Sequence, residues 1–202
     1  MTPEQRSALR RIDRQFDAVR SMPTPIPPRE RYRHGIEDVG VGSYLRCGGE
    51  LYRVESISEY REKGGRWSEL ECFSVTSGGI TWIEWEKDDE VEISVNGPEL
   101  SLAQIGVTAD RVEEMSDEEA GKISFEGRTY HYDDDYEATY LRDGAGQGEK
   151  VYFYDFETKD EKFCLTVEEW GDAASGYEYV AFVSEYVEPD AIEVVVLAAA
   201  GS

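Results

Sequence analysis

The chain of 202 residues is 40% hydrophobic and 12% aromatic, which supplies enough apolar side chain for a core and excludes a fully disordered protein. Its formal net charge of −23 argues against a general nucleic-acid surface, because such surfaces need clustered Lys and Arg. The same charge argues against adhesion of the main body to anionic lipid, and it favours cations, polyamines or basic protein surfaces as partners. A highly soluble surface is the simpler interpretation of the acidity.

The first 33 residues differ in charge from the rest of the chain. Eight Arg against four acidic residues give them a net +4, which leaves −27 for the other 169 residues. The chain has three widely spaced cysteines and no Cys-x-x-Cys pair: Cys47, Cys72 and Cys164. An odd number without such a pair does not suit a disulfide framework, so we expect reduced thiols in a cytoplasmic protein. No signal-like apolar stretch opens the chain, and the apolar run 194–200 is too short to cross a bilayer.

Residues 1–22 predict an Arg-rich amphipathic helix. Thr2 and Gln5 form a candidate capping box around Pro3, which suits the first helical position. One apolar stripe and one basic row follow at helical spacing: Leu9, Ile12, Phe16 and Val19, and Arg6, Arg10 and Arg14. Such a helix can enter a partner's groove, lie on an anionic membrane through residues 4–20, or pack on its own acidic body or a second copy. Residues 23–37 predict an extended, Pro-rich linker.

Residues 38–97 predict a first β unit. Short runs rich in aromatic and β-branched residues alternate with Gly and Asp turns, which is typical of antiparallel sheet. The expected strands cover residues 51–57, 67–75, 80–86 and 91–95. Residues 98–119 are richer in Leu, Ala and Glu, and they predict a linker with short helical turns, one of which begins at Thr108.

The β pattern returns in residues 120–202, the second predicted unit. In both units a Gly-x-x-Tyr sequence precedes a long strand, a Gly-rich turn, an aromatic return strand and a Glu-Trp pair. This repetition predicts an internal duplication. The predicted fold is therefore mainly β, with two related antiparallel β-meander units like small barrels or sandwiches and an N-terminal amphipathic helix.

Several stretches of the two units resemble one known family. They are VGSYLRCGGELYRVE (41–55), the segment around Trp82 to Trp85, FEGRTYHYDDDYEATY (125–140) and LTVEEWGD (165–172). Over roughly residues 38–197, the chain is similar to the bacterial family catalogued as domain of unknown function 4178. That family has no established catalytic activity, so the resemblance assigns no catalytic residue. It implies a context of envelope stress or polyamine-related neighbours.

The repeated Glu-Trp pairs are candidate binding residues: Glu84 with Trp85, and Glu169 with Trp170. Paired carboxylates at a suitable separation can perform acid/base chemistry. The simpler interpretation follows from strand alternation, which points each Trp into the core and each Glu into solvent.

Two other groups of residues carry side chains that occur in metal or catalytic sites. Asp133, Asp134 and Asp135 are weak candidates for a calcium or magnesium site, because the spacing of a calcium loop is missing and a solvated turn explains them. His34 and His131 lie in no nucleophile motif, so we predict no catalytic residue and no cofactor.

We interpret the chain as an acidic β protein that acts as a binding or adaptor module. The expected partner is a protein, one with a basic surface being favoured, and a polyamine or a divalent cation is the alternative ligand. Arg6, Arg10 and Arg14 are candidate contacts in the N-terminal helix. A carboxylate-based or divalent-cation-dependent enzyme is the second hypothesis, and an acidic mimic of nucleic acid is the third.

Overall fold

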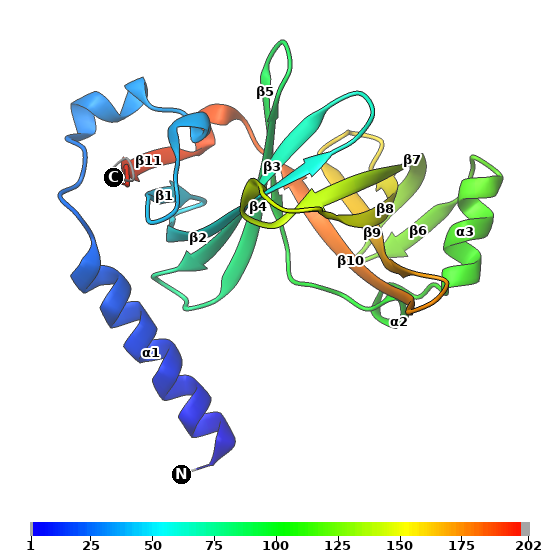
Figure 1. Cartoon of the computed structure of the whole chain (residues 1–202), viewed down its shortest axis with the longest axis horizontal. Helices are drawn as coiled ribbons and strands as arrows, with labels where there is room; N and C mark the ends of the chain where they lie inside the picture. Colours follow the sequence, from blue (N-terminus) through cyan, green and yellow to red (C-terminus); the bar gives the residue numbers. More distant parts are fainter. Residues whose placement is uncertain (1, 199–202) are drawn as a thin grey trace. The chain divides into compact units, whose positions relative to one another are not determined.

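A computed structural model describes residues 2–198 of the chain. Met1, the first residue of the predicted helical segment 1–22, lies outside the described residues. So do residues 199–202, the end of the predicted second unit 120–202. The helices are α1 (Pro3–Ser21), α2 (Leu102–Ile105) and α3 (Ala109–Asp117), with 3-10 turns η1 (Pro28–Arg33), η2 (Ile36–Asp38), η3 (Arg142–Gly144) and η4 (Pro189–Ala191). The strands are β1 (Tyr44–Cys47), β2 (Glu50–Arg61), β3 (Arg66–Ser74), β4 (Ile80–Lys87), β5 (Val91–Asn96), β6 (Lys122–Phe125), β7 (Arg128–Leu141), β8 (Glu149–Glu157), β9 (Phe163–Asp172), β10 (Gly176–Tyr186) and β11 (Glu193–Val196) (Figure 1). The prediction of a mainly β chain with an N-terminal helix is confirmed.

Within the described residues, the strands form one antiparallel sheet in the order β11-β1-β2-β3-β4-β5-β10-β9-β8-β7-β6. Strand β10 pairs with β5, so the two predicted runs of strands join in one sheet. An additional pairing of β2 with β7 makes a partial ring of strands and not a clear barrel. None of the helices in residues 2–198 is both long and apolar enough to cross a membrane.

The chain divides into two compact units that are discontinuous in sequence. Unit 1 contains residues 1–57, 70–83 and 188–202, and unit 2 contains residues 58–69 and 84–187. The long strands β2, β3 and β4 therefore contribute residues to both units. The predicted boundaries at residues 97 and 120, and the predicted internal duplication, stay predictions.

Helix α1 belongs to unit 1 and starts as its sequence indicates. The Thr2 hydroxyl accepts a hydrogen bond from the backbone N–H of Gln5, and the Gln5 side chain accepts one from the backbone N–H of Thr2. Both bonds satisfy backbone donors that the first helical turn leaves without partners.

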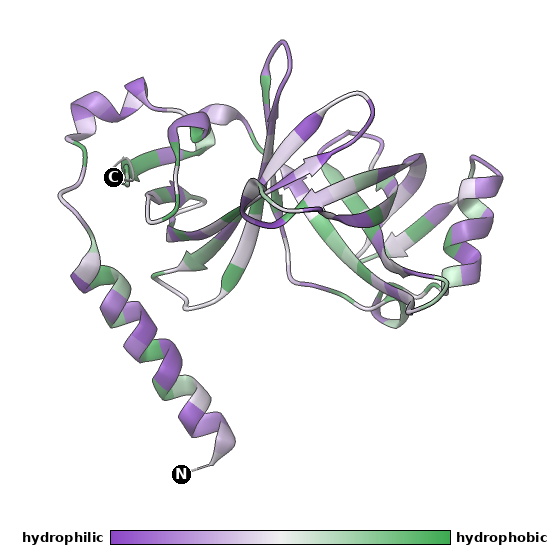
Figure 2. Ribbon diagram, viewed as in Figure 1, coloured by the Kyte–Doolittle hydropathy of each residue, from purple (hydrophilic) through white to green (hydrophobic). Residues whose placement is uncertain are grey.

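The polar side of α1 contacts unit 1, whereas its apolar stripe stays largely exposed. Gln15 donates hydrogen bonds to the carbonyls of Val75 and Thr76, and the Tyr44 hydroxyl donates a 2.5 Å bond to the carbonyl of the buried Ala18. The four stripe residues stay 43–64% exposed: Leu9, Ile12, Phe16 and Val19. Figure 2 shows hydrophobic and hydrophilic residues alternating along α1. The helix thus packs on its own unit through hydrogen bonds and a small contact at Ala18.

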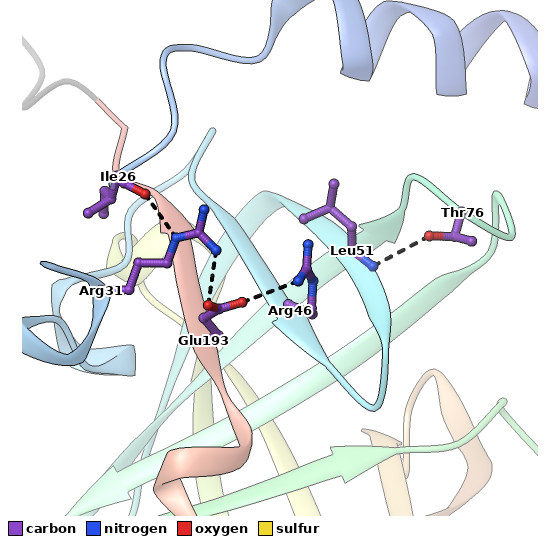
Figure 3. A network of polar contacts seen from close by, with 6 residues as sticks. All are labelled: Ile26, Arg31, Arg46, Leu51, Thr76 and Glu193. Carbon is purple, nitrogen blue, oxygen red and sulfur yellow. Dashed lines mark hydrogen bonds and ion pairs between the residues drawn. The ribbon is translucent and has the colours of Figure 1, made fainter. Parts of the chain in front are cut away.

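The Pro-rich segment after α1 is held against β11 by polar contacts (Figure 3). The backbone N–H of Ile26 donates to the carbonyl of Val195 at 2.8 Å. Arg31 donates to the carbonyl of Ile26 at 2.9 Å and to the carboxylate of Glu193 at 3.0 Å, and Arg46 approaches the other Glu193 oxygen at 3.5 Å. The predicted linker is therefore only partly extended, because its second half forms the turns η1 and η2.

The attachment of α1 gives a first testable prediction. Replacement of Gln15 by Ala removes both side-chain bonds to the turn after β3, and should cost about 1–2 kcal/mol of docking free energy. We expect faster amide hydrogen exchange in residues 3–21, with exchange in unit 2 unchanged. Arg10→Ala, at an exposed position of the same helix, is the control. Equal exchange in the two variants would contradict a docking role for Gln15.

Unit 2 has an apolar core to which the segment between the two runs of strands contributes. Residues of α2, α3 and strands β6 to β10 make up this core: Ile105, Val112, Met115, Ile123, Tyr130, Tyr154, Phe156, Leu165, Val167 and Ala181. Helices α2 and α3 are the helical turns predicted within residues 98–119. The Thr108 hydroxyl caps α3 by accepting a hydrogen bond from the backbone N–H of Arg111.

A second group of unit 2 side chains is aromatic and lies where β2 pairs with β7. Tyr60 stacks on Trp67 with ring centroids 4.9 Å apart, and Tyr136 stacks on Phe153 at 5.2 Å. Tyr140 joins this cluster and meets Trp170 edge to face at 5.4 Å. Trp67, Tyr136 and Phe153 of this cluster line the site described next.

Candidate functional site

Unit 2 contains a cavity of about 280 Å³ with a strongly acidic lining. Seven of the described residues that line it are carboxylic acids, six are aromatic, and none is Lys, Arg or His. The acids come from β4, β5, β7, β8 and β9 and from the residue after β2, so they surround the space: Glu62, Glu84, Glu86, Glu92, Asp134, Asp155 and Glu168. The aromatic residues are Trp67, Trp85, Tyr136, Phe153, Phe182 and Tyr186.

Three of the acids are partly or fully buried, and we call them the inner carboxyls: Glu84, Asp155 and Glu168. Glu84 on β4 accepts a 2.6 Å hydrogen bond from the amide of Asn96, and the Asn96 oxygen in turn accepts a 2.7 Å bond from Ser184. Burial raises the pKa of Glu84 to about 7 against the lowering effect of the Asn96 bond, and the charge of Asp155 raises it further.

Asp155 lies on β8 between the two aromatic residues Tyr154 and Phe156. Its carboxylate accepts a 2.6 Å hydrogen bond from Thr166 and a 3.1 Å bond from the hydroxyl of Tyr136. Burial raises the pKa of Asp155 to about 6, although both hydrogen bonds favour the ionised form.

Glu168 on β9 is the most buried carboxyl of the cavity, at 5% exposure. The indole N–H of Trp170 donates a 2.8 Å hydrogen bond to its Oε2 atom. Burial raises the pKa of Glu168 to about 8, and the charges of Glu84 and Asp155 add to the increase. The three inner carboxyls are therefore close enough to disfavour one another's ionisation.

The other four acids are exposed and lie at the mouth of the cavity; we call Glu62, Glu86, Glu92 and Asp134 the outer carboxyls. Partial burial raises the pKa of Glu86, and the neighbouring charges of Glu92 and Glu62 act in the same direction. Mutual repulsion of this kind is relieved by a bound cation. The acidic lining of the cavity therefore favours positive charge, both at its mouth and inside.

The predicted Glu-Trp pairs are only partly brought together. Glu84 and Trp85 both line the cavity, and Trp170 orients Glu168 from behind it. Glu169, however, accepts hydrogen bonds from Tyr154 and Tyr179, both at 2.9 Å, and does not line the cavity. The expectation that strand alternation leaves the paired Glu side chains in solvent is wrong for Glu84, because β4 turns this carboxyl into the cavity.

The three consecutive aspartates of β7 also separate. Asp134 lines the cavity, whereas Asp135 accepts hydrogen bonds from the hydroxyls of Tyr132 and Tyr152. These bonds outweigh partial burial and lower the pKa of Asp135. A register irregularity of β7 at residues 132–134 accompanies this change of direction. In residues 2–198, no three His, Cys, Asp or Glu side chains are grouped so that they could hold a metal ion.

The predicted basic contacts belong to unit 1. Arg14 of α1 pairs with Glu55 at 3.6 Å and lies 4.2 Å from the centre of the Phe73 ring. Arg6 and Arg10 lie at exposed positions of the same helix. His34 pairs with Asp38 at 3.4 Å, also in unit 1, and His131 lies on β7 outside the cavity lining.

Sequence reasoning missed Asp155 and Glu168. A usable signal was present, because Asp155 interrupts the aromatic run Tyr152 to Phe156, and a carboxyl within a run of buried side chains is unusual. Glu168 is one residue from the predicted Glu169, and this step moves a side chain to the other face of a strand.

The Trp170 contact gives a second prediction. Trp170→Phe keeps an aromatic ring but removes the N–H that stabilises the ionised form of Glu168, so the pKa of Glu168 should rise further. Carbon-13 NMR titration of the Glu side-chain carboxyls would measure it. Trp85→Phe is the comparison, because the Trp85 indole is not the donor to Glu168. An unchanged or lower pKa in Trp170→Phe would contradict the role of this hydrogen bond.

Comparison with known proteins identifies the family. The model of the domain of unknown function DUF4178 matches residues 40–189, a range that includes all of unit 2 and every described residue that lines the cavity. The chain therefore belongs to the DUF4178 family. Searches of curated proteins and of solved structures returned no match.

Proposed function

We propose that this DUF4178-family chain is a binding module, and that the cavity of unit 2 takes a linear polyamine cation. The observation that carries the proposal is the cavity lining, which combines seven carboxylic acids and six aromatic rings with no cationic side chain among its described residues. An acidic body with a net charge of −23 for the whole chain also favours a cationic ligand.

Each part of a polyamine has a matching part of the cavity. Its ammonium groups would pair with carboxylates, and such charge-assisted hydrogen bonds are stronger than neutral ones. Its methylene segments would lie against rings such as Trp67, Tyr136 and Phe153, which also attract ammonium groups through their faces. Because inner and outer carboxyls lie at different depths, a ligand with charges spaced along a chain can pair with both sets.

Isothermal titration calorimetry of the full chain with spermidine tests the proposal. We expect saturable binding with one site per chain, weakened by added salt because the contacts are between charges. Magnesium chloride at equal ionic strength and N-acetylated spermidine are the controls, and each should bind more weakly. Spermidine binding no tighter than magnesium binding would overturn the proposal. Preferential binding of a Lys-rich peptide would favour the protein-partner alternative.

A carboxylate-based enzyme is the second candidate, and one observation favours it. Three carboxyl groups with pKa values of about 6, 7 and 8 share one cavity. In active sites, carboxyl groups with different pKa values can act as acid and base at the same pH. Mass spectrometry of spermidine after prolonged incubation with the protein distinguishes the candidates. Recovery of unchanged ligand favours binding, and a new product that disappears in Glu168→Gln favours catalysis.

A further inference from the structure

The inner carboxyls share a cavity whose described lining offers no cationic partner, although they lie close together. We propose that this cavity is a proton-exchange site, in which entry of a cationic ligand releases protons from Glu84, Asp155 and Glu168. The inference rests on the proposed function, because it specifies how the same site is regulated.

The geometry supplies the first step of the argument. Among residues 2–198, the side-chain donors to the inner carboxyls are neutral: Asn96 for Glu84, Thr166 and Tyr136 for Asp155, and Trp170 for Glu168. Neutral donors support one negative charge, but they do not offset the repulsion of three charges withdrawn from water. Without a ligand, the cavity therefore holds protons.

The other titratable groups around the site add no positive charge to it. The outer carboxyls Glu62, Glu86, Glu92 and Asp134 share the cavity with Tyr136, Cys164 and Tyr186, and Tyr60, Glu99, Asp133 and Glu157 lie near enough to interact with an inner carboxyl. All of these groups are neutral or negative. The raised pKa values of the inner carboxyls, from about 6 to about 8, agree with this environment.

The exchange balances in charge and atoms. An inner carboxylic acid loses its proton to solvent, and the resulting carboxylate pairs with an ammonium group that enters already charged. No covalent bond of the ligand changes. Where binding releases one proton, the affinity rises about tenfold for each unit of pH. Affinity for a ligand of fixed charge should therefore increase between pH 6 and pH 8.

Calorimetry with hexamethonium tests the exchange, because its two quaternary ammonium groups cannot titrate and every released proton comes from the protein. Binding to the full chain is measured at pH 7 in phosphate and in Tris, whose ionisation enthalpies differ. We expect different observed enthalpies, which correspond to release of about one proton, and an affinity about tenfold higher at pH 8 than at pH 7. Equal enthalpies in the two buffers, with binding intact, would overturn the inference.

Variants separate this outcome from failure of the proposed function. Glu168→Gln removes the most buried exchanging group, so fewer protons should be released per bound ligand, whereas Glu169→Gln on the other side of β9 should release the wild-type number. Equal release by both variants would overturn the assignment to Glu168. Absence of binding by both hexamethonium and spermidine would instead refute the proposed function.

Discussion

The Glu84→Gln, Glu168→Gln double variant is expected to bind spermidine about 100-fold more weakly than the natural chain, or worse. Each substitution removes a charge-assisted contact of about 1.5–3 kcal/mol and leaves a side chain of nearly the same shape. Two such losses add to about 3 kcal/mol or more, and each 1.4 kcal/mol corresponds to a factor of ten in the dissociation constant. Isothermal titration calorimetry at pH 8 measures the change.

The fold should survive this double substitution. The Gln side chain keeps an oxygen that accepts the hydrogen bonds from Asn96 and Trp170. Glu169→Gln is the matched control, because its carboxyl bonds to Tyr154 and Tyr179 outside the cavity lining. Natural affinity in the double variant, with a native circular dichroism spectrum, would remove the inner carboxyls from the binding site.

The ligand-free protein should lose stability as the pH rises from about 5 to about 8. The inner carboxyls have pKa values of about 6, 7 and 8 in the folded chain, above the values of about 4 that they have when unfolded. Between the two pKa values of a group, the folded state holds a proton that the unfolded state has released. Each such group therefore lowers the free energy of unfolding by about 1.4 kcal/mol per pH unit in that window.

Urea denaturation at several pH values tests this slope. Glu168→Gln has no carboxyl to ionise at the most buried position, so its stability should fall less steeply and exceed that of the natural chain at pH 8. A saturating polyamine should reduce the slope in the natural chain for the same reason, since it stabilises the ionised form. A free energy of unfolding that is constant or rising from pH 5 to pH 8 would contradict the buried environment of these groups.

Much of the fold could be predicted because its signals are local. Capping by Thr2 and Thr108 depends on residues three positions away, and alternating β-branched and aromatic residues mark the strands. The strand order could not be predicted in this way. The pairing of β10 with β5 joins Ser184 to Asn96, which are far apart in the chain, and no local pattern specifies such a partner.

Only the part of the site that a local sequence pattern marks could be predicted. Glu84 stood out beside Trp85, but its companions Asp155 and Glu168 come from β8 and β9, and only the folded sheet brings them to one cavity. The inferred repeat selected Glu169 instead of Glu168, because sequence alignment does not determine which face of a strand borders a cavity. In the same way, the helical spacing of α1 revealed an apolar stripe but not that the polar side would contact unit 1.

The backbone hydrogen bond from Ile26 to Val195 places a segment over an edge of the sheet on which another chain could add a strand. Strand β11 ends the order of the sheet, so its outer backbone groups are a template on which another chain could add a strand. The segment that covers this edge has Pro at positions 23, 25, 27 and 28, and Pro lacks the N–H that a growing ladder needs. Removal of residues 1–28 would uncover this template and favour fibrous or amorphous aggregates. Partner studies on α1 should therefore use point variants of its side chains in the intact chain.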